Sequence, residues 1–261
     1  NQENQNNQFK KLNCSPSRLN NKETTCYSNN ELLKLRDLWN KRHPDVIIEE
    51  NNPTSIWSIL KNNMKNICNE ESCWLKQQFV KDNNIINLLG YAFAPKTPLS
   101  WNKNKNEWLS SIDIEKVMKQ WEHKNKSFAF MGPSPIDFNK KINDDDCVWE
   151  ELCNFNLEKL IKKNKTKIGI IFNLDPHYKS GSHWVSLFIN LKENYICFFD
   201  SNGTKCPKQI LKLVKNIVAQ GKKLNKDFKF IQNSPNQHQK KDTECGMYSL
   251  FFIIQLLEGL K

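Results

Sequence analysis

The segment GSHWVSLFINLKENYICFFD, residues 181–200, predicts a β-hairpin at the centre of the fold. Two runs rich in β-branched and aromatic residues flank the polar tetrapeptide LKEN at 191–194. Such runs are typical of strands, and four residues is a common length for a hairpin loop. With this loop as the turn, Asn190 pairs with Tyr195.

The same register brings a histidine and an acid together. Continuing the antiparallel ladder places Val185 opposite Asp200 and His183 opposite Asn202. Because strand side chains alternate between faces, His183 and Asp200 then lie on the same face and at the same end of the strand pair. An acid beside an imidazole fixes its tautomer and stabilises the imidazolium. Either residue alone would be interpreted as an ordinary surface or turn residue.

Other elements surround the predicted hairpin. Short β-like runs alternate with helices, which predicts an α/β or α+β core with a mixed or largely antiparallel sheet. The expected elements are a helix from Ser111 to about Trp121, strands at 168–174, 183–189, 195–200 and 228–232, a helix at 210–219 and a terminal helix from Cys245.

Upstream of these elements, the amino-acid composition of the chain changes. Residues 1–30 are polar and rich in Asn and Gln, and we expect a flexible lead-in. Residues 31–95 carry apolar residues at helical spacing and predict a small helical arm domain. The Pro-containing link AFAPKTPLS at 92–100 leads into the remaining domain, residues 96–261, which contains the hairpin.

The composition restricts the class of protein. With 38% hydrophobic residues the 261-residue chain can bury a substantial core, and no apolar run is as long as a membrane span. The N-terminus has no signal-peptide pattern, although the chain lacks an initiator Met, so targeting stays open. The formal charge of +11 is explained either by a solvated basic surface or by a weak contact with nucleic acid or another anionic partner. Interspersed Lys and Asn, as in KKNKTK at 162–167, favour the solvated surface.

Cysteine usage gives a second restriction. Nine scattered cysteines favour free thiols in a reducing compartment over a disulfide framework. Cys197, Cys147 and Cys153 are interpreted as small buried hydrophobes. The four N-terminal cysteines are spaced too irregularly for a zinc site and are expected to be reduced; they are Cys14, Cys26, Cys68 and Cys73. Neither a metal nor a cofactor is expected.

One cysteine is a candidate nucleophile. Cys245 opens CGMYSLFFIIQLL, which is apolar nearly all round and predicts a buried helix. The positive end of a helix dipole stabilises a thiolate. Cys206, in a loop near Asp200, is a weaker rival. The Cys245 backbone N–H and the side chain of either Gln239 or Gln237 could donate to an oxyanion.

These residues carry a resemblance. The order His-Trp, strand, Asp, then Gln-x5-Cys-Gly is similar to the ubiquitin-like-protein (SUMO) protease and adenain group of cysteine peptidases, clan CE. The segment HQKKDTECGMYS at 238–249 resembles most closely the polyprotein-processing proteases of African swine fever virus and related large DNA viruses. The resemblance covers residues 100–261 and implies an α+β fold, a mixed central sheet packed by helices, with the Cys helix against it.

The resemblance also implies roles. It assigns His183, Asp200 and Cys245 to a catalytic triad and Gln239, rather than Gln237, to the oxyanion hole. Trp184 and Trp108 would line a narrow substrate channel that admits Gly-Gly, and Asn173 would lie near the site. In place of the family's Asn-Asp after Trp-Leu, this chain has Ser110 and Ser111.

The implied activity is a cysteine endopeptidase that cleaves after Gly-Gly in viral core or capsid polyprotein precursors. The alternatives are a deconjugating isopeptidase for SUMO or ubiquitin-like tails, a non-catalytic module that binds Gly-Gly tails, and an acyltransferase. The implied partner is a protein with a Gly-Gly-X site, and the arm would place the enzyme on a precursor. The expected location is the viral factory in the host cytoplasm and the virion, or otherwise the cytoplasm or nucleus, and not secretion.

Overall fold

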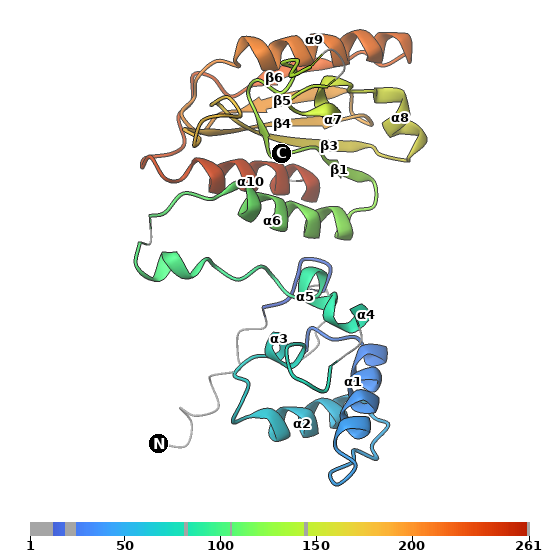
Figure 1. Cartoon of the computed structure of the whole chain (residues 1–261). Helices are drawn as coiled ribbons and strands as arrows, with labels where there is room; N and C mark the ends of the chain where they lie inside the picture. The colour runs from blue at the N-terminus through green and yellow to red at the C-terminus, as the bar shows by residue number, and fades with distance from the viewer. Residues whose placement is uncertain (1–12, 19–24, 81–82, 105, 144–145, 260–261) are drawn as a thin grey trace. The chain divides into compact units, whose positions relative to one another are not determined.

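The computed structural model describes residues 13–18, 25–80, 83–104, 106–143 and 146–259, in two units that span residues 1–96 and 97–261 (Figure 1). No helix among these described residues is long and apolar enough to cross a membrane. Each unit has hydrophobic clusters of its own, one in the first unit and two in the second.

The first unit is helical. Its two longer helices, α1 (Asn29–Arg42) and α2 (Pro53–Met64), pack against each other and bury apolar residues at i, i+3 and i+4 spacing. Ser28 and Glu31 form a capping box at the start of α1, which satisfies backbone donors that the first turn leaves unpaired. Short helices complete the unit: α3 (Glu71–Trp74), α4 (Asn83–Ile86) and α5 (Leu88–Tyr91).

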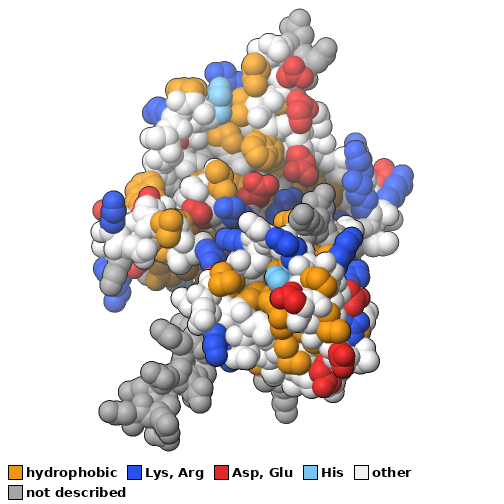
Figure 2. Space-filling model, turned by 60° about the horizontal axis from the view of Figure 1, so that its bottom comes forward, with side chains coloured by type: hydrophobic (Ala, Val, Ile, Leu, Met, Phe, Trp, Pro, Cys, Tyr) orange, Lys and Arg blue, Asp and Glu red, His pale blue; other side chains and the backbone are white. Residues whose placement is uncertain are grey.

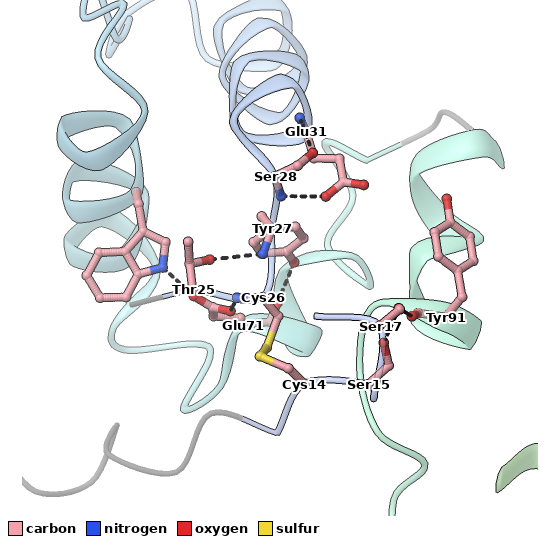
Figure 3. The surroundings of a disulfide bond; sticks show 11 residues. Cys14, Ser15, Ser17, Thr25, Cys26, Tyr27, Ser28, Glu31, Glu71 and Tyr91 are labelled. Atoms are coloured by element: carbon pink, nitrogen blue, oxygen red, sulfur yellow. Dashed lines mark hydrogen bonds between the residues drawn. A yellow bond between two sulfur atoms is a disulfide. The ribbon is translucent and has the colours of Figure 1, made fainter. Parts of the chain in front are cut away.

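The described part of the predicted lead-in is packed, which corrects that prediction for residues 13–18 and 25–30. Cys14 and Cys26 form a disulfide (Figure 3), and Tyr27 is 1% exposed. The Cys26 N–H donates to the buried carboxylate of Glu71, and the Tyr27 hydroxyl donates to the Glu71 backbone carbonyl at 2.7 Å. These contacts fasten the segment to α3. The rest of the lead-in lies outside the described residues.

Two more disulfides join Cys68 to Cys73 and Cys147 to Cys153. The predictions that these cysteines are free thiols, and that Cys147 and Cys153 are simple buried hydrophobes, are therefore wrong. Folding brings each pair to Cα separations of 5.3–6.3 Å, which suits a disulfide. The four N-terminal cysteines are used in bonds and cannot ligate zinc, and cysteine usage no longer favours a reducing compartment.

The second unit is built on one mixed sheet of six strands in the order β1-β3-β4-β5-β6, with β2 also paired to β3. The pairs β3–β4 and β4–β5 are antiparallel, whereas β1, β2 and β6 pair in parallel. The strands are β1 (Phe128–Phe130), β2 (Ser134–Pro135), β3 (Lys167–Asn173), β4 (Trp184–Asn190), β5 (Tyr195–Phe199) and β6 (Lys229–Gln232).

The predicted hairpin is confirmed. Asn190 pairs with Tyr195 and Ser186 with Phe199, with the turn at 191–194. All of β4 is buried because both faces of the sheet are covered. Alternate residues such as Val185 and Leu187 enter one hydrophobic cluster, and Trp184 and Phe188 enter the other.

Helices cover the two faces of this sheet (Figure 1). On one face α10 (Cys245–Glu258) packs against β4, and α6 (Ser111–Lys124) packs against α10. On the other face lies α9 (Lys208–Lys223), with α8 (Leu157–Lys162) beside it. A short 3₁₀ helix, Leu99–Asn102, and α7 (Glu150–Cys153) complete the unit. The α+β class with a mixed sheet packed by helices is confirmed.

The helix α10 departs from the sequence prediction in one respect. Met247 and Phe251 are 54% and 60% exposed, so the helix is not buried all round. They are one turn apart and share a face directed away from the sheet. The opposite face, which includes Leu250 and Ile253, is buried.

Candidate active site

The end of the hairpin holds a histidine–carboxylate pair, as its register predicts. His183 lies immediately before β4, and Asp200 immediately after β5. The His183 Nε2 is 2.7 Å from the Asp200 Oδ1. The side chain of Cys245 is the second neighbour that raises the pKa of the His183 imidazole. The structure therefore brings the three predicted residues together.

The environment of this pair favours the charged form of both partners. Burial alone would lower the pKa of His183, but hydrogen bonds with Asp200 and Cys245 outweigh it and raise the pKa to about 9. Burial would raise the pKa of Asp200, yet hydrogen bonds from His183 and Thr204 and the backbone of Asn202 lower it. The site thus favours an imidazolium held by a carboxylate at neutral pH.

Asp200 is positioned by contacts that the sequence analysis missed. Asn233 accepts a hydrogen bond from the Asp200 N–H at 2.9 Å and donates to the Asp200 carbonyl at 2.7 Å. The Thr204 hydroxyl donates to the second carboxylate oxygen. Asp200 is 1% exposed, so its oxygens depend on these partners in place of water. The DSNGT sequence signals a turn, but nothing in the sequence points to Asn233.

Cys245 is the first residue of α10 and is 1% exposed. Gly246 follows it at a point of close packing. A Cβ on Gly246 would lie 3.0 Å from the Leu109 Cβ and 3.3 Å from the Trp184 Cδ1. The Trp184 indole in turn donates to the Leu109 carbonyl at 3.0 Å. The Cys-Gly pair therefore lets the start of α10 lie directly against Trp184.

The two candidate glutamines differ in position. Gln239 is 4% exposed, and its N–H donates to the Ser201 carbonyl. The Ser201 hydroxyl donates to the Gln239 Oε1 at 2.6 Å. That bond fixes the carboxamide so that its NH₂ remains available as a donor. Gln237 is exposed and donates to the Gln239 carbonyl, so the geometry favours Gln239.

A cavity of about 580 Å³ adjoins this site. Its lining includes the three predicted substrate residues, Trp108, Trp184 and Asn173. Trp108 is 39% exposed, whereas Trp184 is 6% exposed and stands between the cavity and α10. His183 and Cys245 do not line the cavity. The two tryptophans therefore line one cavity, and Trp184 also lies against the start of α10.

Asn173 and Ser110 have structural contacts that explain their residue types. The Asn173 Oδ1 accepts hydrogen bonds from the N–H groups of Asp175 and Ser182, which closes the loop leading to His183. Ser110, where the resemblance calls for Asn, is the N-cap of α6 and accepts from the Asp113 N–H. Ser and Asn are both favourable N-caps, so the departure preserves this helix start next to Trp108.

The other free cysteines are poor nucleophiles. Burial raises the pKa of Cys197 to about 11 and that of Cys206 to about 12, so both stay protonated near neutral pH. Within the described ranges, His, Cys, Asp and Glu do not gather in any group of three or more that could hold a metal ion.

Comparison with known proteins identifies a protein family and several relatives of this chain. Residues 114–261, more than half of the chain, match the Ulp1 protease family, C-terminal catalytic domain. Protein R355 of Acanthamoeba polyphaga mimivirus, whose name describes a thiol protease, is 27% identical over 268 residues, covering 94% of this chain and 84% of R355. The cysteine protease S273R of African swine fever virus is 26% identical over 214 residues, covering 74% of each chain.

Solved structures agree on the fold. The crystal structure of the African swine fever virus pS273R protease superimposes with a TM-score of 0.67 at 20% sequence identity, covering 96% of this chain and 87% of that one. Taken together with the family match and the geometry at the end of the hairpin, these findings show that the chain belongs to the Ulp1 protease family and is a cysteine protease.

Proposed function

We propose that this protease cleaves protein chains after Gly-Gly and processes the structural polyprotein precursors of a virus. The observation that carries the proposal is the packing of Trp184 against Leu109 and Gly246. A substrate that reaches Cys245 past this tryptophan must be narrow, and two residues without side chains satisfy that requirement. The viral relatives support the choice of a viral precursor.

The proposed mechanism uses only residues of the second unit. His183, oriented by Asp200, holds the proton taken from Cys245 as an imidazolium, and the thiolate attacks the carbonyl carbon of the second glycine. The Cys245 N–H and the Gln239 amide donate to the oxyanion. The His183 imidazolium then gives its proton to the leaving amine as the C–N bond breaks. Water, deprotonated by His183, hydrolyses the thioester and restores the thiol.

The proposal includes further partners and a location. The cavity lined by Trp108 and Trp184 would receive the residues upstream of Gly-Gly, with Asn173 at its edge. The charge of +11 adds a weaker class of partner, an anionic molecule that contacts the basic surface. Viral factories in the host cytoplasm, and the virion, are where such a precursor would be met.

The test is cleavage of a panel of fluorogenic peptides by the wild type and by Cys245→Ala. The panel holds Gly-Gly-X, Ala-Gly-X and Gly-Ala-X peptides and a SUMO-tail substrate. We expect the viral-type Gly-Gly-X peptides to be turned over faster than the SUMO-tail substrate, no turnover of Ala-Gly-X or Gly-Ala-X, and loss of all turnover in Cys245→Ala. Cys206→Ala is the matched control and should keep wild-type turnover, because the pKa of Cys206 keeps its thiol protonated.

Two other outcomes would change the proposal. Equal turnover of Gly-Gly-X and Gly-Ala-X would show that the channel does not select for glycine. Turnover of the SUMO tail alone would replace precursor processing with deconjugation.

A further inference from the structure

The surface of α9 concentrates the positive charge of the chain. Residues 205–229 contain eight lysines and one acid, Asp227, so this stretch holds a net charge of +7 out of +11. The five lysines within α9 are all exposed: Lys208, Lys212, Lys215, Lys222 and Lys223. The helix contains no Asp or Glu. Most of the excess charge is therefore carried by one segment.

These five lysines form a single stripe. At 3.6 residues per turn their spacing keeps them within an arc of about 100° and along about 22 Å of helix. The opposite side of α9 is in the core, where Ile210, Leu213 and Ile217 are buried. Like charges one turn apart destabilise a helix. The stripe therefore lowers the stability of α9, and a role in folding does not explain its presence.

A general abundance of lysine codons does not explain the stripe. The same bias acts on α1 and α6, yet these helices mix signs: Glu31 and Asp37 accompany the basic residues of α1, and Asp113, Glu115 and Glu122 those of α6. Basic and acidic side chains are also interspersed on the face of the molecule shown in Figure 2. In KKNKTK, Lys165 and Lys167 are used internally, where they donate to backbone carbonyls.

An apolar hollow runs beside the stripe. It has a volume of about 500 Å³ and is lined by Lys215 and Lys222 of the stripe together with apolar side chains from α9, from β6 and from the residue that precedes β6. The apolar members are Leu211, Val214, Val218, Ala219, Phe228 and Phe230. Phe230 is half-buried, on the last strand of the sheet. Cations and an aromatic surface therefore lie next to each other.

We propose that α9 and this hollow bind single-stranded nucleic acid. Successive phosphates would contact the lysine stripe, whose length of about 22 Å spans several phosphates of one strand. Unpaired bases would enter the hollow and contact Phe230 and the aliphatic side chains. A lipid surface fits less well, because the apolar groups are recessed and α9 exposes no large hydrophobic side chain that could insert. Binding would hold the protease on a polyanion without involving the candidate active site.

The test is fluorescence anisotropy of a labelled 20-nucleotide single strand with the whole chain, at 50–300 mM salt. The five-lysine variant changes Lys208, Lys212, Lys215, Lys222 and Lys223 to Gln. The control variant changes five exposed lysines elsewhere to Gln, namely Lys34, Lys41, Lys76, Lys103 and Lys116. Both variants have the same net charge. Circular dichroism melts verify that each is folded.

We expect the wild type to bind with a logarithmic salt slope of about −3.5, the value for five contacts on a single strand. The five-lysine variant should bind at least tenfold more weakly, and the control within twofold. Ala219→Glu, which places an anion between stripe and hollow, should also weaken binding severalfold. If the five-lysine variant and the control variant lose the same binding affinity, the net charge alone explains binding and the proposed site is wrong. Tighter binding to duplex DNA, or to vesicles with anionic lipid, would overturn the choice of ligand. No arm of this test depends on peptide cleavage.

Discussion

At the residue scale, the raised pKa of His183 sets a basic limit on activity. The folded pKa is about 9 against an ordinary 6.5, so the imidazolium persists well above neutral pH. We expect kcat/KM to fall as the pH rises through about 9, where His183 can no longer protonate the leaving amine. The measurement is the pH profile of kcat/KM between pH 5 and 10. Asp200→Asn should move the basic limb to lower pH, because it replaces the carboxylate that raises this pKa with a neutral amide. A basic limb at the same pH in the wild type and in Asp200→Asn would contradict the assignment of this limb to His183.

The pKa shifts of His183 and Asp200 also determine how the folding stability changes with pH. The His183 contribution to folding is complete below about pH 6.5 and is lost as the pH rises through about 9, because the folded state binds the proton more tightly. The Asp200 contribution has the opposite sense, since its pKa is lowered. It is present above the ordinary range of an Asp and is lost as the pH falls through the lowered pKa.

Ser201 is the second residue whose effect can be predicted. Its hydroxyl orients Gln239 and does not touch the substrate, so it is a positioning residue. Ser201→Ala leaves the Gln239 Oε1 unpaired and the carboxamide free to rotate. We expect kcat to fall roughly tenfold, equivalent to about 1.4 kcal/mol, with KM little changed. Ser249→Ala is the matched control, since this hydroxyl is buried and has no hydrogen-bond partner. A KM effect without a kcat effect would show that Ser201 acts on binding.

At the element scale, the approach of α10 to Trp184 depends on Gly246. A methyl group there would lie 3.0 Å from Leu109, closer than most Cβ contacts, and would displace the helix start that carries Cys245. Since small misplacements of reacting groups are costly, we expect Gly246→Ala to lower kcat/KM by about 10- to 100-fold. Circular dichroism melts separate this effect from unfolding. Gly90→Ala is the control, because a Cβ at Gly90 meets nothing within 4 Å. Wild-type kcat/KM in Gly246→Ala would show that the start of α10 tolerates displacement.

The elements that the sequence predicts are those with local signals. The 181–200 hairpin has alternating strands and a polar turn, and its register, and hence the His183–Asp200 contact, follows from them. The parallel strands β1 and β2 have three and two residues, too few for a periodic pattern, and are not predicted. Asn233 lies 33 residues from Asp200, and only the folded chain brings them together. The disulfides are missed for the same reason, because their pairing depends on the fold.

At the scale of the whole molecule, every residue of the candidate active site lies in the unit of residues 97–261, whereas the Cys14–Cys26 disulfide lies in the helical unit. The two units have separate hydrophobic clusters, so we expect two unfolding transitions. Removing the disulfide with Cys14→Ala and Cys26→Ala should destabilise the first unit by roughly 2–3 kcal/mol, the contribution of a crosslink that closes a short loop. Thermal unfolding measured by calorimetry, and denaturant unfolding followed by tryptophan fluorescence, should each show one transition shifted and the other unchanged. Turnover of a Gly-Gly-X peptide should persist after the first transition, since His183, Asp200 and Cys245 would remain in a folded unit. If turnover is lost with the first transition, the helical unit is required to maintain the active site, and the two units would have to be treated as one cooperative enzyme.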